Sequence, residues 1–265
     1  MRGSSHGNLA ATLAVLASAT LFGTTGTVLV NAPDAADAYS VGAVRLLIGG
    51  ATLLAVAAWH GGRCAWAPWR MPVTALGALG VAVFQLGYFL AVERTGVAVG
   101  TVVTIGSGPV LSGVIHAAMA RRAPARHWLV GTAVSVVGVA LLGLAGQSSA
   151  AEPVGILLAV LAGLGWAVFA TVGKHQIEQG VESTASMAAM FCGGALLLSP
   201  LLLSHSPDWV LHDGGPWVAL YLGVVTVGAA YTLYGIALRA LPAPTVITLT
   251  LLEPITAALL GAVVV

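Results

Sequence analysis

The sequence predicts an all-α integral membrane protein. Charged residues make up only 7% of its 265 residues, and its mean hydropathy is +0.97. The apolar residues gather in nine continuous stretches of about twenty residues, the length that a helix needs to cross roughly 30 Å of hydrocarbon. A water-soluble fold of this size cannot bury so much apolar surface, so we expect the function to lie within a membrane.

The predicted spans are helices and not barrel strands. The apolar runs are continuous instead of alternating, and they are about twice the length of a barrel strand. Glycine is frequent, with 34 residues, as in membrane helices whose backbones approach closely at small residues. The nine predicted spans are 8–30, 39–60, 72–92, 96–120, 128–145, 153–173, 184–204, 216–238 and 243–265.

Two rows of small residues are candidate contacts between these helices. Gly77 and Gly80 share one face of the third predicted span, and Gly131, Ser135 and Gly138 share a face of the fifth. Such rows either mark close packing of helices or merely reflect the high glycine content of the chain.

The distribution of Lys and Arg predicts the orientation of the chain. With a cytoplasmic N-terminus, eight of the ten basic residues fall on the cytoplasmic side, Arg94 falls outside, and Arg45 lies within the second span. We therefore expect a multi-pass protein of a bacterial cytoplasmic (inner) membrane with its N-terminus in the cytoplasm. The eight are Arg2, Arg63, Arg70, Arg121, Arg122, Arg126, Lys174 and Arg239.

The composition argues against several classes of function. The net charge is only +1 and the basic residues are scattered among loops, which is not the pattern of a nucleic-acid-binding protein. There is no paired carboxylate, no nucleophile beside a base, no phosphate-binding loop and no metal-ligand spacing. We therefore expect neither enzyme chemistry nor a cofactor or metal. The sequence does not indicate an oligomeric state.

The second half of the chain repeats the pattern of the first. A segment around Arg94 aligns without a gap on one around Arg239, and the same offset of 145 residues places Pro109 on Pro254. Each segment has a span, a tight turn and a second span with a proline at mid-depth. We predict a first five-helix repeat over residues 1–147 and a second, incomplete repeat of four helices over 148–265.

An odd number of spans per repeat requires the second copy to be inverted in the membrane. The charges agree, because the turn at Arg94 falls outside and its counterpart at Arg239 falls inside. Inverted repeats are how many secondary transporters build a site near the midplane with two alternating access routes.

The chain resembles the EamA-type transporters of the drug/metabolite transporter superfamily over essentially its whole length. The resemblance implies two inverted five-helix halves around a central cavity, and export of small organic metabolites, often amino acids. The residues that carry the resemblance are Leu21-Phe22-Gly23, Arg45, Ser107-Gly108-Pro109, Gly165-Trp166-Ala167 and Leu252-Glu253-Pro254.

The sequence departs from the family pattern in two places. The Gly-Glu-Arg that often follows the fourth helix is replaced by Met119-Ala120-Arg121-Arg122, and no tenth helix follows the ninth span. From the missing helix we expect a C-terminally incomplete form of a ten-helix protein.

Glu253 is the leading candidate for a functional residue. It lies about ten residues into the last span, and at 1.5 Å per residue this places it roughly 15 Å deep, near the midplane. An ionisable group at that depth is costly unless it is paired, hydrated or protonated. Pro254 should leave the carbonyl of Thr250 without its helical partner. Glu253 either binds a substrate amine or a proton, or satisfies neighbouring backbone in a structural role.

Arg45 lies about six residues inside the second span, near its outer end. Three roles are open for its side chain. It can extend outward to the interface, pair with Asp37, or bind a substrate carboxylate. The sequence favours a structural or topological role over substrate binding.

Polar and aromatic side chains recur at helical spacing in several spans. Such residues in a membrane bundle either line a cavity or bond across helices. We expect the aromatic residues and the glutamine to line a cavity, and the threonine to bond between helices. These candidates are Gln85, Tyr88, Thr104, Trp166, Tyr231 and Tyr234.

The sequence as a whole predicts a secondary transporter that exports a small, amino-acid-like or amphipathic metabolite by alternating access. Polyanionic substrates such as nucleotide sugars are disfavoured, because Arg45 is the only basic residue within a span. The expected partners are the small-molecule substrate, the lipid bilayer and, if Glu253 titrates, protons. The alternatives are a membrane assembly or regulatory protein that transports nothing, and a lipid or drug flippase.

Overall fold

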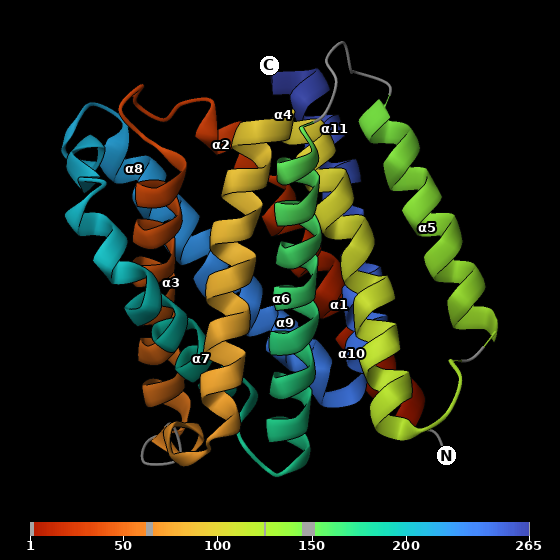
Figure 1. The fold of residues 1–265 in the computed structure, drawn as a ribbon. Helices are drawn as coiled ribbons and strands as arrows, with labels where there is room; N and C mark the ends of the chain where they lie inside the picture. Colours follow the sequence, from red (N-terminus) through yellow and green to blue (C-terminus); the bar gives the residue numbers. More distant parts are fainter. Residues whose placement is uncertain (1–2, 62–65, 125, 145–151, 265) are drawn as a thin grey trace.

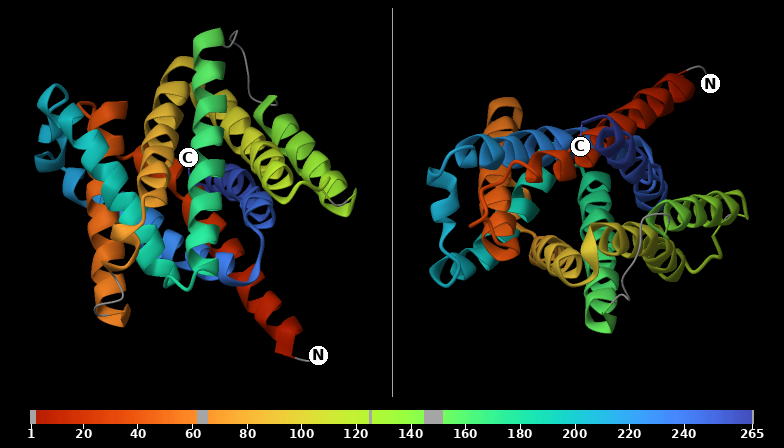
Figure 2. Two further views of the ribbon diagram at one scale, coloured as in Figure 1. Left: turned by 60° about the horizontal axis from the view of Figure 1, so that its bottom comes forward. Right: turned by 90° about the horizontal axis from the view of Figure 1, so that it is seen from above.

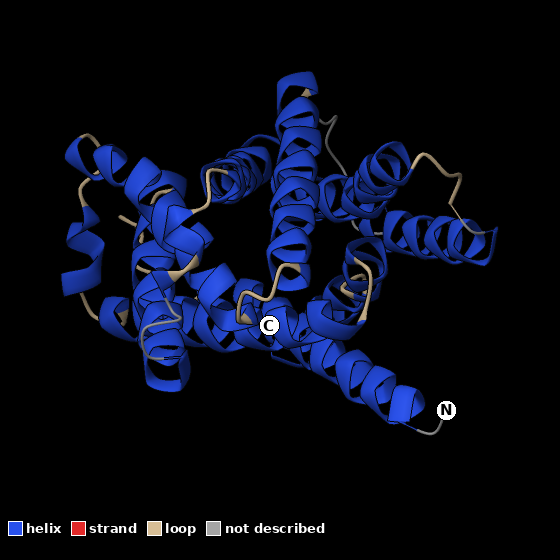
Figure 3. Cartoon of the chain, turned by 90° about the horizontal axis from the view of Figure 1, so that it is seen from below, coloured by secondary structure: helices blue, strands red, loops and turns tan. Residues whose placement is uncertain are grey.

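The computed structural model describes residues 3–61, 66–124, 126–144 and 152–264, and these residues form helices and loops without a strand (Figure 3). The all-α membrane class is therefore confirmed. Within the described residues, eight helical segments are long and apolar enough to cross a membrane. They are Gly7–Leu29, Ala38–His60, Val73–Gly96, Val99–Ala120, Pro153–Glu178, Ser183–Leu203, Gly215–Ala240 and Ala243–Gly261.

These eight segments coincide with eight of the nine predicted spans. The ninth prediction, 128–145, corresponds to a further helix, α5 (Arg126–Leu144), and residue 145 lies outside the described part of the chain. The count of nine spans and the tenth helix of a complete repeat stay predictions.

The helices follow one another with short connections (Figure 1). Several predicted spans are built from two or three shorter elements. Before α5 the elements are α1 (Gly3–Gly23), α2 (Thr25–Leu29), α3 (Ala38–Gly61), η2 (Pro68–Arg70) and α4 (Val73–Ala120). After α5 they are α6 (Pro153–Glu178), α7 (Ser183–Leu198), η3 (Ser199–Leu203), η4 (Pro207–Leu211), α8 (Gly215–Leu220), η5 (Tyr221–Ala229), α9 (Ala230–Ala240), α10 (Ala243–Leu249) and α11 (Leu252–Val264).

The third and fourth predicted spans form the two arms of a sharply bent α4. The bend is at Gly96, whose φ of 79° and ψ of 159° are not helical and suit a residue without a side chain. The counterpart of Gly96 at the 145-residue offset is Leu241, which separates α9 from α10 in an extended conformation. The two halves of the chain thus break their helices at corresponding positions.

Helix α6 lies between the two arms of α4 (Figure 1). A Cβ atom on Gly165 would lie only 2.5 Å from the carbonyl oxygen of Gly80 on the first arm. One on Gly163 would lie 3.0 Å from the carbonyl oxygen of Thr104 on the second arm. These glycines therefore let the backbones touch, as small residues do in membrane bundles.

The structure tests the predicted glycine row of the third span fully and that of the fifth span at one residue only. Gly77 faces Met190 and Gly80 faces α6, so the contact face of the third span is confirmed. Gly131 has open space where a Cβ would stand. The surroundings of the other two members of its row, Ser135 and Gly138, lie outside what the structure describes.

The interior of the bundle is rich in aromatic residues. Phe169, Phe191 and Tyr234 are almost completely buried where α6, α7 and α9 meet. Apolar side chains such as Leu76 and Val134 are exposed instead, as expected of a surface that faces lipid. The start of α1 extends beyond the other helices, and α5 lies at the edge of the bundle (Figure 2).

Candidate functional site

The candidate site lies where several spans depart from regular α-helix. The first span is interrupted at Thr24, between α1 and α2, and the last at residues 250–251, between α10 and α11. The eighth contains η5, a π-helical segment. Interrupted membrane helices commonly frame transporter sites, and π-helical turns are frequent at functional positions.

The interruption before Glu253 does not leave the carbonyl of Thr250 free, as the sequence suggested. The backbone N–H of Glu253 donates to the Thr250 oxygen at 2.9 Å, closing a tighter turn at the point where Pro254 has no N–H. As a result α11 starts anew at Leu252, with Glu253 in its first turn.

The first and last spans cross in contact at this level. A Cβ on Gly23 would lie 2.6 Å from the Cβ of Thr256 and 2.8 Å from the carbonyl oxygen of Glu253. Gly23 therefore permits the approach of the two chain segments. The crossing brings residues more than two hundred positions apart to opposite walls of one space.

A small cavity lies inside this crossing. Its volume is about 20 Å³, which is room for about one water molecule and not for a metabolite. The walls come from spans in both halves of the chain. The lining residues are Phe22, Thr25, Arg45, Phe84, Tyr88, Ile105, Trp166, Tyr231 and Glu253.

Two opposite charges line this cavity. Arg45 is only 6% exposed and Glu253 is partly buried. Their charged groups are not among the ion pairs found between described residues, so they share the space without direct contact. Arg45 Nη2 lies 3.5 Å from the carbonyl oxygen of Thr226 in η5, a long hydrogen bond, and Arg45 Nε has no partner. The cavity thus presents a cationic donor and a carboxylate from different helices.

Aromatic rings form the rest of the wall. Phe22 and Tyr231 have ring centroids 4.8 Å apart, and Phe84 lies 5.8 Å from Trp166. The hydroxyl groups of Tyr88 and Thr101 are 3.1 Å apart, which links the two arms of α4 beside the cavity. An apolar wall with few convergent polar groups is the usual composition of a small-molecule site.

Five of the eight site residues named from the sequence line this cavity, namely Arg45, Tyr88, Trp166, Tyr231 and Glu253. The other three, Gln85, Thr104 and Tyr234, are buried beside it without lining it. Arg45 does not extend to the membrane surface. Asp37, its other suggested partner, is bound to residues near the start of α3 instead.

Unsatisfied polar atoms concentrate on the same residues. Within the described residues, seven buried side-chain nitrogen or oxygen atoms have no hydrogen-bond partner, and five belong to site residues named from the sequence. Each such atom costs about 1–3 kcal/mol if left unpaired. Of the five, only the atoms of Arg45 and Trp166 belong to residues that line the cavity and could meet a polar ligand group, because Gln85, Thr104 and Tyr234 do not line it. The five are Arg45 Nε, Gln85 Nε2, Thr104 Oγ1, Trp166 Nε1 and the Tyr234 hydroxyl.

Sequence reasoning did not single out Thr25, Phe84 and Ile105 as lining residues. Phe84 and Ile105 are apolar residues within apolar spans, so their type carries no signal. Thr25 directly follows the interruption at Thr24. A threonine pair after Leu21-Phe22-Gly23 was the available indication, but only the broken helix shows that it faces the cavity.

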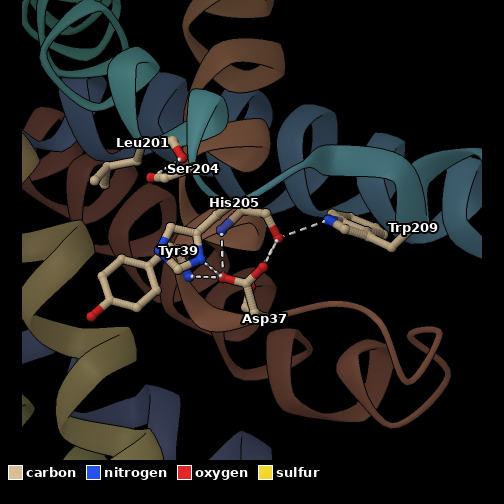
Figure 4. Close-up of polar contacts among 7 residues, drawn as sticks. Asp37, Tyr39, Leu201, Ser204, His205 and Trp209 are labelled. Carbon is tan, nitrogen blue, oxygen red and sulfur yellow. Dashed lines mark hydrogen bonds and ion pairs between the residues drawn. The ribbon is translucent and has the colours of Figure 1, made fainter.

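A second polar cluster lies at the end of the second span, around the start of α3 (Figure 4). One carboxylate oxygen of Asp37 accepts from the backbone N–H groups of Tyr39 and Ser40 at 2.9 and 3.1 Å, and the other accepts from the Ser40 hydroxyl at 2.7 Å. His205 Nδ1 lies 3.4 Å from the same carboxylate, and its ring stacks on Tyr39. Trp209 donates to the Ser40 hydroxyl at 3.1 Å. Asp37 therefore caps α3 and joins it to the segment between α7 and α8.

The hydrogen bonds of this cluster change the acidity of Asp37. Partial burial acts to raise the pKa of its carboxyl, but donation by the Ser40 hydroxyl and by the Ser40 and Tyr39 N–H groups, with the proximity of His205, outweighs burial. The pKa of Asp37 is consequently lowered from its ordinary value of 3.8.

Comparisons with known proteins point to one family. Residues 9–144 and 153–265 match the EamA-like transporter family. A Bacillus subtilis (strain 168) protein named uncharacterized transporter YwfM is 36% identical over 249 residues, which are 94% of this chain and 83% of that protein. A solved structure described only as the crystal structure of a protein shares the fold, with a TM-score of 0.79 at 20% identity, over 96% of this chain and 87% of its own.

Proposed function

Because the chain belongs to the EamA-like transporter family, as its sequence motifs suggested, we propose that this membrane transporter is a secondary transporter of a small zwitterionic metabolite. The observation that carries the proposal is that Arg45 and Glu253 both line one aromatic-walled cavity without forming an ion pair. In this proposal Arg45 binds a carboxylate of the substrate and Glu253 binds its amine.

The chemistry of the cavity supports an amino-acid-like substrate. A guanidinium group binds a carboxylate through two parallel hydrogen bonds, and a carboxylate accepts from an ammonium group. The rings of Phe22, Phe84 and Tyr231 offer contact to an apolar side chain. A polyanionic substrate would leave its extra charges without partners, since Arg45 is the basic residue of this cavity.

The size of the cavity supports an alternating-access mechanism. A space of about 20 Å³ holds no metabolite, so the helices around it must separate before substrate can enter. The corresponding breaks at Gly96 and Leu241 support two inverted repeats, over 1–147 and 148–265, as the moving parts.

The expected direction is export from the cytoplasm. We place the protein in the bacterial cytoplasmic membrane with the N-terminus and the 121–126 loop inside, because Lys and Arg are distributed asymmetrically among the loops. Exchange of substrate across the membrane requires no coupling ion. For net transport, protons are the candidate coupling ion.

The experiment uses purified protein in liposomes loaded with a radiolabelled mixture of amino acids. Exchange should occur with external amino acids that carry both charged groups. The matching methyl esters lack the carboxylate and the matching deaminated acids lack the amine, so neither should support exchange. Arg45→Gln should abolish exchange, whereas Arg70→Gln, at the exposed end of η2, is the matched control and should not.

Two results would count against the zwitterion proposal. One is equal exchange of the amino acids and of their one-charge analogues. The other is full exchange by a correctly folded Arg45→Gln protein, which would move substrate recognition away from this cavity.

A further inference from the structure

Helix α6 is in close contact with α4 at its middle. Near its middle, Gly163 and Gly165 bring its backbone into contact with both arms of α4. If the middle of the helix moved away from the arms, these close backbone contacts and their packing would be lost. The two ends of α6 lie at opposite ends of the bundle (Figure 1).

The first end of α6 is tied to the bend of α4. Arg94 Nη1 lies 2.9 Å from Glu152 Oε1, directly before α6, and the two side chains are 46% and 44% exposed. One turn later Gly155 is pressed against the same bend, where a Cβ would lie 2.4 Å from Thr95 Cγ2. We name this pair of contacts the outer tie.

The second end of α6 is tied to the last turn of α9, just before the connection to α10. Lys174 Nζ donates to the carbonyl oxygen of Leu238 at 2.9 Å, and the Lys174 side chain is only 20% exposed. Glu178 lies 3.6 Å from the same ammonium group on the solvent side. We name the Lys174–Leu238 hydrogen bond the inner tie.

The inner tie borders a second cavity. A hollow of about 380 Å³ lies between the ends of α4 and α6 and the turn between α9 and α10, and it reaches from Thr171 to Pro242. This hollow lies between the site and the surface that we assign to the cytoplasm. The helix ends on that side are therefore already partly separated around Lys174.

The two ties hold corresponding turns of the two halves. Arg94 lies two residues before the bend at Gly96, and Leu238 lies three residues before the break at Leu241. Leu241 is the counterpart of Gly96 at the 145-residue offset of the repeat. One straight helix thus contacts both turns, one near each membrane surface. Both ties are formed while the central cavity is too small to hold a metabolite.

We propose that Glu152 and Lys174 are positioning residues that determine to which side of the membrane the substrate cavity opens. The proposal rests on the alternating-access function and on the orientation inferred above. The middle of α6 acts as a fixed contact between the arms of α4. Release of the outer tie lets the Gly96 bend separate from α6 and opens the cavity outward, and release of the inner tie opens it to the cytoplasm.

The test is labelling of one reporter cysteine from each side of the membrane. Ile105, which lines the cavity and is 2% exposed, is replaced by cysteine in a chain in which Cys64 and Cys192 are alanine. A membrane-impermeant maleimide is applied to right-side-out and to inside-out vesicles, and the two labelling rates are compared. No substrate is needed.

The two variants should shift the labelling in opposite directions. Glu152→Gln should raise the outside rate about two- to fivefold, the range expected for an exposed ion pair. Lys174→Met should raise the cytoplasmic rate about tenfold, because a largely buried ammonium–carbonyl hydrogen bond is stronger. A residue that merely stabilises the fold would change both rates alike.

Conservative variants serve as controls. Glu152→Asp and Lys174→Arg should keep the parent ratio, and Glu178→Gln should also keep it because the bond from Lys174 to Leu238 remains. If Glu152→Gln fails to fold, Gly155→Ala tests the outer tie by inserting a methyl group against Thr95.

Equal changes on both sides, no change, or the mirror-image pattern in folded protein would overturn the proposal. Failure of the zwitterion proposal gives a different result. In that case exchange of amino acids is absent while the opposite shifts in labelling remain.

Discussion

At the scale of single residues, the energetic cost of Arg45 and Glu253 makes their position informative. A charged group within the hydrocarbon region costs from a few to several kcal/mol unless it is paired or hydrated. Two such groups from different helices line one small cavity without a direct ion pair. A ligand that brings the complementary charges would satisfy both groups at once, which is the physical basis of the zwitterion proposal.

Glu253 is also the candidate for proton coupling. We expect Glu253→Gln to weaken substrate binding, because the amide cannot pair with an ammonium group, and to remove the dependence of the remaining flux on a pH gradient, because the amide cannot carry a proton. Protein abundance should be unchanged. The measurement is substrate flux in liposomes with and without an imposed pH gradient, with Glu93→Gln, an exposed carboxylate, as the control. Unchanged gradient dependence in the Glu253 variant would assign coupling to another group.

Asp37 provides a prediction about stability and pH. Its pKa is lowered on folding, so its contribution is complete above the ordinary value of 3.8 and is lost as the pH falls through the lower pKa of the folded state. Asp37→Ala should cost about 0.5–2 kcal/mol at neutral pH, as expected for loss of a helix N-cap. Thermal unfolding in detergent should show the difference at pH 7 and a smaller one near pH 3. A constant difference across this range would contradict the assignment.

At the scale of the elements, interruptions and small residues shape this bundle. The bend at Gly96 turns one helix into two arms, and the interruptions at Thr24 and at residues 250–251 open a place for polar groups in apolar spans. Glycines at the crossings let backbones meet where larger residues would hold the helices apart. The site therefore depends on helix contacts several residues away from it.

Gly165→Ala tests this dependence. Its new methyl group would lie 2.5 Å from the carbonyl oxygen of Gly80, so α6 and α4 must separate. We expect a loss of about 1–3 kcal/mol, as for overpacking in a tightly packed core. The matched control is Gly131→Ala, which has open space at that position and should be neutral or stabilising by up to about 1 kcal/mol. Thermal stability in detergent compares the two, and equal effects would show that the close approach is unimportant.

At the scale of the whole molecule, charge and repeat together define the proposed mechanism. Basic residues gather on one side of the membrane by the prediction from the sequence, and the two turns that correspond in the repeat lie on opposite sides. Helix α6 contacts both turns, so the two halves are mechanically connected through one element.

Orientation can be measured directly. A single cysteine at Asp208 should react with an impermeant maleimide applied outside, and one at Gln179 should react only from the cytoplasmic side. Both positions are exposed, Asp208 in the short helix η4 and Gln179 in the turn after α6. Their reaction on the opposite sides would reverse the orientation and remove the support for export and for the sides assigned to the two ties.

Much of the fold could be predicted because membrane helices carry their signal locally. A run of about twenty apolar residues is sufficient to identify a span, and eight of the predicted spans are long, apolar helices in the structure. Individual site residues were also recognisable, since a polar group in an apolar run stands out. Phe84 and Ile105 line the cavity as well, but an apolar residue in an apolar span gives no such contrast.

The sequence by itself determined the membrane class, the approximate spans and the polar residues within them, because hydrophobicity and charge act residue by residue. Only the tertiary structure decided that Arg45 turns inward to the same cavity as Glu253, and that α6 is tied at both ends. These arrangements depend on the rotation and crossing of helices far apart in the chain. Close contacts such as those at Gly23 and Gly165 set that geometry, and the spacing of residues along one helix does not report it.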